Sequence, residues 1–137
     1  MQTITVTAVG KFLRSYWPSA LIVCVILYAT WLPGHLEPSN LPKIPHLDKL
    51  IHAVMFGGLT GAILFDRRRG GTRLNSGIVL ATAAGTLAFG AVDEWVQGLL
   101  PIGRPSDILD LCADAAGIIV ATLTAPAVVN AIFRKHS

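Results

Sequence analysis

The sequence predicts an all-α integral membrane protein, a bundle of four transmembrane helices with both termini in the cytoplasm. Charged residues make up only 14% of the 137 residues, whereas an average soluble domain has about 25%. The chain also divides into four apolar runs, each near the roughly 20 residues that a membrane-spanning helix needs. Finally, lysine and arginine are concentrated in alternate connections between these runs, a pattern that sets the orientation of membrane proteins.

The first two apolar runs predict helices at about residues 17–32 and 48–65. Trp17, Tyr28 and Trp31 lie near the ends of the first run, and aromatic side chains are enriched at both membrane interfaces. A signal peptide is the alternative, because a basic lead precedes this run, but no small-residue cleavage site follows it. In the second run, the spacing of Gly57 and Gly61 favours close packing against a neighbouring helix.

The third and fourth runs predict helices at about residues 74–100 and 107–133, which completes a single domain over residues 1–137. With four spans, the N-terminal lead, the loop that contains Arg67 and the C-terminal tail share one side of the membrane. That side carries eight of the eleven lysine and arginine residues and only one acidic residue, Asp66. The positive-inside rule therefore places both termini in the cytoplasm and the other seven acidic residues toward the outer side.

Ionisable and amide residues gather at the predicted outer ends of three helices. Their spacing by three, four or seven positions places those of each helix on one face, and the topology brings all of them to one depth. Because charge at the edge of the hydrocarbon core is costly, we interpret this group as a functional site. We call it the acidic cluster: Asp48, Lys49 and His52 on the second helix, Asp93, Glu94 and Gln97 on the third, and Asp107, Asp110 and Asp114 on the fourth.

Helix capping is an alternative role for two of these acids. Asp107 has the position of an N-cap and Asp110 lies in the first turn, where carboxylates favour the helix dipole. Asp114 is two turns into the helix, where no unpaired amide remains. A central Asp costs roughly 2.5–3.5 kcal/mol on insertion scales, so we expect Asp114 to face the protein interior or a wet cleft. A lone His52 would be typical of a satisfied core histidine, but its proximity to Asp48 favours a functional role.

The order and spacing of these residues resemble the VanZ-like family of small bacterial membrane proteins, named for a teicoplanin-resistance protein. The resemblance covers about half of the chain, and the position of Asp114 is more often Asn in that family. It implies a four-helix protein of the bacterial cytoplasmic membrane with a role in glycopeptide susceptibility, but no established reaction. The matching motifs are Asp48-Lys49-x-x-His52-x-x-x-Phe56, then Asp93-Glu94-x-x-Gln97, then Pro101, Arg104, Asp107, Asp110 and Asp114-x-x-Gly117.

The first functional hypothesis is an enzyme acting on a phosphate-linked lipid headgroup, either a metal-assisted phosphodiester hydrolase or a headgroup transferase. His52 would be the general base or nucleophile, oriented by Asp48. Carboxylate oxygens suit a divalent cation such as Mg, Mn or Ca. The remaining assignments are Asp93, Gln97 and Asp110 as further catalytic residues, Lys49, Arg104, Glu94 and Ser106 as substrate-binding residues, and Asp93, Asp110 and Asp114 as metal ligands.

Two other hypotheses remain open. A non-catalytic module that binds a cationic or lipid-linked ligand would explain why the outer side has seven acidic but only three basic residues. A small transporter could use the intramembrane acids as a path. The expected partner is a membrane lipid or a lipid-linked cell-wall precursor. Nucleic acid is excluded, since the basic residues lie between apolar runs and not along one face. Self-association into a homo-oligomer is compatible with so small a scaffold.

Overall fold

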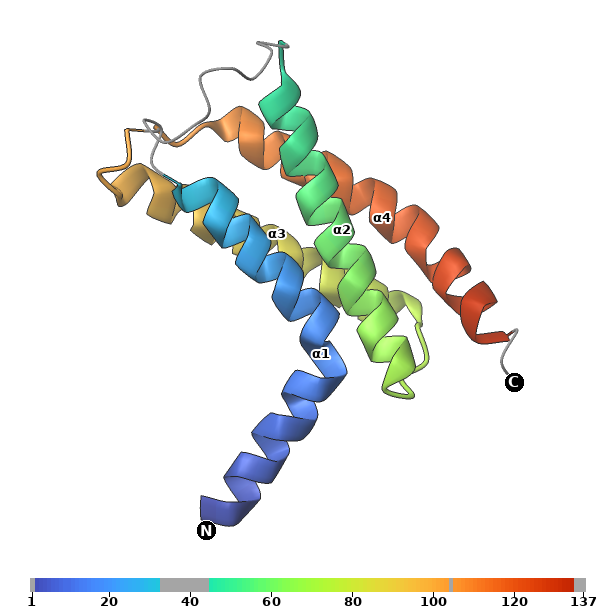
Figure 1. Cartoon of the computed structure of the whole chain (residues 1–137). Helices are drawn as coiled ribbons and strands as arrows, with labels where there is room; N and C mark the ends of the chain where they lie inside the picture. Colours follow the sequence, from blue (N-terminus) through green and yellow to red (C-terminus); the bar gives the residue numbers. More distant parts are fainter. Residues whose placement is uncertain (1, 33–44, 104, 135–137) are drawn as a thin grey trace.

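The computed structural model describes residues 2–32, 45–103 and 105–134, and it shows four helices with no strand among them (Figure 1). For residues 2–9 and 11–13 it describes the backbone alone. The all-helical prediction is confirmed, and α2, α3 and α4 are each long and apolar enough to cross a membrane. The helices are α1 (Gln2–Trp31), α2 (Leu47–Arg69), α3 (Ser76–Leu99) and α4 (Ile108–Arg134).

The helix bounds differ most from the prediction at the start of the chain and at the end of α2. The helix predicted at about 17–32 begins at Gln2. α2 continues to Arg69, so Arg67 and Arg68 belong to its last turn and not to a loop. Basic side chains suit that position, because the carbonyl end of a helix carries partial negative charge. At the start of α3, the Asn75 side chain accepts a hydrogen bond of 2.9 Å from the Ile78 N–H and caps the helix.

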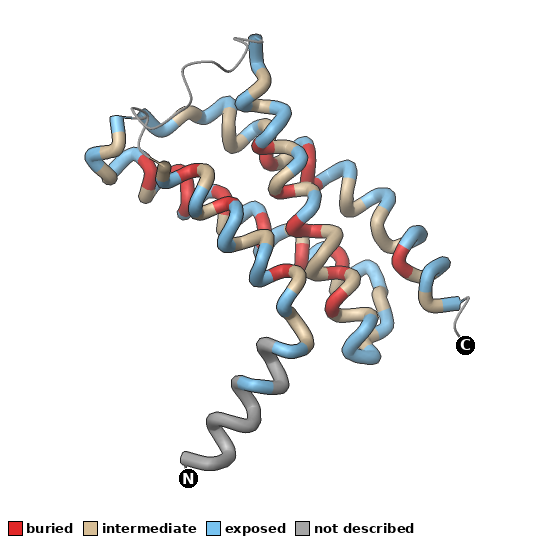
Figure 2. The backbone as a smooth tube through the Cα atoms, viewed as in Figure 1, coloured by how far each residue is buried: buried red, intermediate tan, exposed pale blue. Residues whose placement is uncertain are grey.

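The interior of the bundle is polar and its exterior is apolar. Eleven polar or charged residues are buried among those described, whereas the buried apolar cluster is small and centres on Phe56 and Leu59. Large apolar residues face outward instead, and Leu123 is 76% exposed. Figure 2 shows the buried positions along the sides of the helices that face one another. In lipid, helices associate through packing and interhelical hydrogen bonds, and this distribution is therefore the one expected of a membrane bundle.

α2 packs most extensively against α4, because two glycines allow their backbones to meet. A Cβ atom added to Gly57 would lie 2.9 Å from the carbonyl oxygen of Gly117, and one added to Gly117 would overlap the Ala53 carbonyl. The close packing predicted for Gly57 is therefore present, and its partner is α4. Gly61 contributes less, since a Cβ atom added there would lie 4.0 Å from the Ala125 methyl group, an ordinary van der Waals distance.

α1 is broken near its middle. Tyr16 has non-helical backbone angles (φ −114°, ψ 20°), and Pro18 follows two residues later. Proline lacks the N–H that would bond the carbonyl four residues earlier, and its ring crowds that carbonyl, so a sharp bend results. On the N-terminal side of the break, residues Gln2–Ser15 form an arm that turns away from the rest of the bundle (Figure 1).

Candidate functional site

A buried pair formed by His52 and Asp114 links α2 to α4 within the acidic cluster. The Nδ1 atom of His52 is 2.9 Å from Oδ1 of Asp114, and the residues are 8% and 1% exposed. The His52 ring also stacks against the Phe56 ring one turn further along α2. Because a carboxylate can only accept, Nδ1 carries the proton and Nε2 is left as the second, reactive nitrogen. That nitrogen is 3.9 Å from Oδ2 of Asp110.

The orienting partner of His52 is therefore Asp114. The spacing along α2 predicted Asp48 in this role instead. Asp48 pairs with Lys49 at 3.0 Å, and its side chain is 53% exposed. The four-residue spacing does place Asp48 and His52 on one side of α2, but Asp48 lies a turn nearer the helix end, where Lys49 is the closer charge. As predicted, Asp114 faces the protein interior.

Lys49 neutralises the start of α4. Its Nζ atom donates to Oδ2 of Asp107 and to Oδ1 of Asp110, both at 2.5 Å, in addition to Asp48. An ammonium group has three N–H donors, so all three are used on carboxylates and none is left for a phosphate group. The Lys49 ammonium holds the pKa of Asp107 below its usual range. The contribution of this ion pair to stability is therefore lost only as the pH falls through that lowered pKa.

Asp107 also caps α4, as the capping interpretation predicted. Its Oδ1 atom accepts a hydrogen bond of 2.9 Å from the Leu109 N–H. Its own N–H donates to Oε1 of Glu94, a buried residue of α3. Asp110 lies one turn later and bonds Lys49, so it belongs to the ion-pair network rather than to the cap. Glu94 and Asp107 together tie the start of α4 to α3.

Asp93 and Gln97 fasten α3 to the C-terminal end of α1. Oδ1 of Asp93 accepts hydrogen bonds from Nε1 of Trp31 at 2.9 Å and from Oγ1 of Thr30 at 3.2 Å. Nε2 of Gln97 donates to the Thr30 carbonyl oxygen at 2.7 Å. Thr30 and Trp31 were not predicted as members of the cluster, since the aromatic character of Trp31 only indicated a membrane interface.

Replacing Trp31 with phenylalanine is expected to lower the free energy of unfolding by about 1–3 kcal/mol, because it removes the indole donor from a buried carboxylate. The matched control is Trp95→Phe, which changes an indole of α3 that is 65% exposed. Thermal unfolding in detergent micelles would compare the two variants. Equal stabilities would show that the bond between Trp31 and Asp93 does not hold α1.

The predicted metal ligands are not arranged as a metal site. Among the described residues, no group of three or more His, Cys, Asp or Glu side chains could hold a metal ion. Asp93, Asp110 and Asp114 each accept from a different partner, namely Trp31, Lys49 and His52. The carboxylate oxygens of these residues are therefore not arranged as ligands for the predicted divalent cation.

The two remaining predicted substrate-binding residues lie around the connection between α3 and α4. Ser106 is exposed, and its Cβ atom would be 3.1 Å from a Cβ atom added to Gly98. Arg104 lies outside the described residues. Closer to His52, Gly90 leaves room for the buried pair, since a Cβ atom there would lie 3.1 Å from both Oδ2 of Asp114 and the Phe56 ring.

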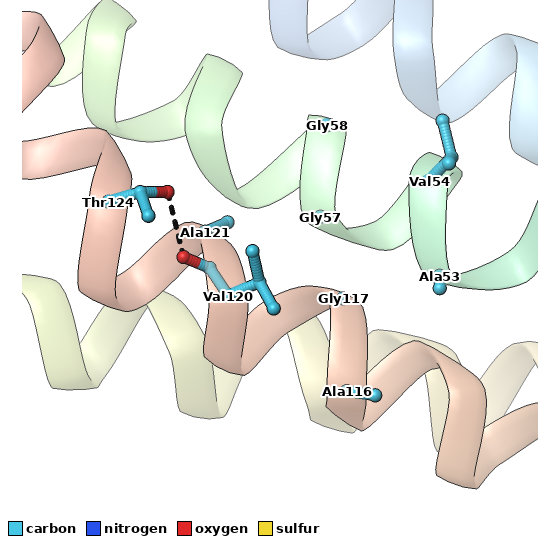
Figure 3. A pocket seen from close by; sticks show the side chains of 9 residues that line it. All are labelled: Ala53, Val54, Gly57, Gly58, Ala116, Gly117, Val120, Ala121 and Thr124. Carbon is cyan, nitrogen blue, oxygen red and sulfur yellow. Dashed lines mark hydrogen bonds between the residues drawn. The ribbon is translucent and has the colours of Figure 1, made fainter. Parts of the chain in front are cut away.

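A separate open groove with a volume of about 410 Å³ lies between α2 and α4 (Figure 3). Its lining contains no residue of the acidic cluster and is apolar apart from Thr124, whose hydroxyl donates to the Val120 carbonyl of its own helix. The lining consists of small or aliphatic side chains, among them Val54, Gly57, Gly58, Gly117 and Val120. The groove is therefore apolar and contains no reactive group.

Four helices with a polar interior and a buried His–Asp pair at one end define a small helical membrane protein with a candidate acid–base site. The VanZ/LLP1 family model matches residues 4–130, so the chain belongs to the VanZ-like family. Comparisons with curated proteins and with solved structures gave no match. The predicted family is confirmed, and the match extends well beyond the motifs to include most of α1.

Proposed function

We propose that this protein is an enzyme of the bacterial cytoplasmic membrane that acts on the phosphate-linked headgroup of a lipid or lipid-linked cell-wall precursor. The observation that carries the proposal is the buried hydrogen bond between Nδ1 of His52 and Asp114. An imidazole held in this way has its other nitrogen free to act as a general base. By analogy with the protein that gave the family its name, the role in the cell would be a change in susceptibility to glycopeptides such as teicoplanin.

The proposed arrangement in the membrane has four spans and cytoplasmic termini, which places the acidic cluster at the outer leaflet. Two features support it. α2, α3 and α4 are apolar enough to span. Arg67, Arg68 and Arg69 end α2, whereas Asp48 begins it, so the basic and acidic ends of this helix lie on opposite sides. A headgroup in the outer leaflet would then lie at the depth of His52.

The proposed step is a displacement at phosphorus. Nε2 of His52 takes a proton from water, or from the hydroxyl of an acceptor, as that oxygen attacks phosphorus. The bond from phosphorus to the leaving-group oxygen breaks, and the imidazolium donates its proton to the leaving-group oxygen. Asp114 stabilises the imidazolium through Nδ1–H. Lys49 keeps Asp107 and Asp110 in place, and Arg104 remains the predicted phosphate ligand.

Mass spectrometry of membrane lipids tests this proposal, using cells that produce the wild type or a variant at matched levels. A headgroup species that changes with the wild type is expected to return to the control level with His52→Ala. The matched control is Asp48→Asn, which alters an exposed acid of the same helix without touching His52. Unchanged turnover in His52→Ala would exclude His52 as the base.

A non-catalytic module for a cationic ligand is the second candidate, and the charge of the cluster favours it. The described part of the cluster holds six acids against Lys49 and His52, and Lys49 is fully engaged. Such a module would bind a cationic lipid analogue equally well in wild type and His52→Ala, and the affinity would fall as salt screens the charges. Salt-insensitive binding would count against it.

A further inference from the structure

Polar groups of α2 satisfy the backbone where α1 is broken. In an unbroken helix, the N–H groups at positions 18 and 19 would bond the carbonyls of Arg14 and Ser15. Pro18 has no N–H, and the Ser19 N–H donates instead to Oδ2 of Asp66, at 3.1 Å. Both carbonyls accept from the guanidinium of Arg69, the one of Arg14 at 3.3 Å. The backbone groups whose helical hydrogen bonds are lost at the break therefore find partners on α2.

The partners themselves are fixed. Asp66 is 1% exposed, its Oδ2 atom also accepts from the Ser19 hydroxyl at 2.6 Å, and its Oδ1 atom lies 3.3 Å from Arg69. An unpaired N–H group at Ser19 would be costly, because Ser19 is buried within the bundle. α2 therefore supplies both an anionic acceptor, Asp66, and a cationic donor, Arg69, at the break. These contacts fix the direction in which α1 bends.

The break lies at the level expected for a membrane interface. Trp17 is 56% exposed directly beside it, and Arg14 is exposed on its other side. The contacts to Asp66 and Arg69 place it at the basic end of α2. Aromatic and basic residues together mark the headgroup region. The arm Gln2–Ser15 therefore continues from this level, and Figure 1 shows that it turns sideways from the bundle instead of extending along it.

We infer that the arm Gln2–Ser15 lies along the membrane surface and binds anionic phospholipid headgroups of the leaflet at the basic end of α2. Charge decides the partner: residues 1–15 contain Lys11 and Arg14 and no acidic residue. Basic residues near an anionic surface are attracted to it within about one Debye length. This inference does not depend on the chemistry proposed for His52, which lies at the other end of α2.

A spin label on the arm tests the inference. Gly10 suits a label, because it is exposed and a Cβ atom there would meet nothing within 4 Å. The full-length Gly10→Cys chain would be prepared with Cys24→Ala and Cys112→Ala, which remove the native thiols. After reconstitution into vesicles of phosphatidylcholine with phosphatidylglycerol, accessibility to oxygen and to an aqueous nickel complex gives the depth of the label.

We expect the label to lie at headgroup depth in the anionic vesicles. It should be released into water in vesicles of phosphatidylcholine alone and at high salt. A label in water in the anionic vesicles would overturn the inference, and so would one within the hydrocarbon core. Headgroup depth that is the same in both vesicle types and at high salt would overturn the choice of anionic lipid as partner.

Charge variants make the test specific. The double variant Lys11→Gln/Arg14→Gln should lower the ratio of bound to released arm on the order of tenfold. The fold should persist, because Arg14 contacts Arg69 through its backbone carbonyl. The control Arg73→Gln/Arg134→Gln removes two exposed charges from the same end of the bundle but leaves the arm unchanged. Equal release in both double variants would overturn a specific role for the arm.

Discussion

Replacing Gly117 with alanine is expected to destabilise the bundle by about 1–3 kcal/mol or more, because a methyl group there would overlap the carbonyl of Ala53. The overlap involves backbone on α2, which cannot move aside as a flexible side chain could. α2 and α4 would have to separate, and the pair formed by His52 and Asp114 spans the same interface. Denaturation by a graded detergent titration would measure the loss.

The matched control for Gly117→Ala is Gly58→Ala. Gly58 is an exposed glycine of α2 beside the same interface, but a Cβ atom there would meet nothing within 4 Å. Alanine is a better helix former than glycine by up to about 1 kcal/mol, so this variant should be as stable as the wild type or more so. If both variants lost the same stability, close backbone contact would not be what holds α2 to α4.

Local sequence patterns predicted four helices, and the one predicted at about residues 17–32 corresponds to the C-terminal half of α1. Hydropathy and length located α2, α3 and α4, because a membrane span needs about 20 apolar residues whatever its neighbours are. The extension of α1 to Gln2 was not predicted, since that segment mixes polar and apolar residues and Pro18 indicates a break. In the structure, Asp66 and Arg69 bond the backbone groups at that break. Those contacts join residues far apart in the sequence.

The same limit explains what was predicted of the acidic cluster. Spacing along one helix showed which residues share a face, and it placed His52 and Asp114 near one depth. It could not choose between Asp48 and Asp114 as the partner of His52, because that depends on how α4 crosses α2 at Gly57 and Gly117. The hydrogen bond from Trp31 to Asp93 could not be predicted from local sequence either, since the two residues belong to different helices.

Replacing Asp114 with alanine is expected to lower the free energy of unfolding by about 1–3 kcal/mol, because it leaves the buried Nδ1–H donor of His52 without an acceptor. Asp114→Asn is the informative comparison. The amide oxygen can still accept the hydrogen bond from Nδ1 of His52, so the free energy of unfolding should fall by less than in the alanine variant, by about 1 kcal/mol or less. Thermal unfolding in detergent would separate the two variants.

The two variants of Asp114 also separate a structural role from a chemical one. If His52 is a general base, Asp114→Asn keeps the imidazole in place but removes the charge that stabilises its protonated form, and headgroup turnover should fall on the order of 100-fold in a folded protein. A folded Asp114→Asn protein with full turnover would mean that the carboxylate serves only to join α2 to α4.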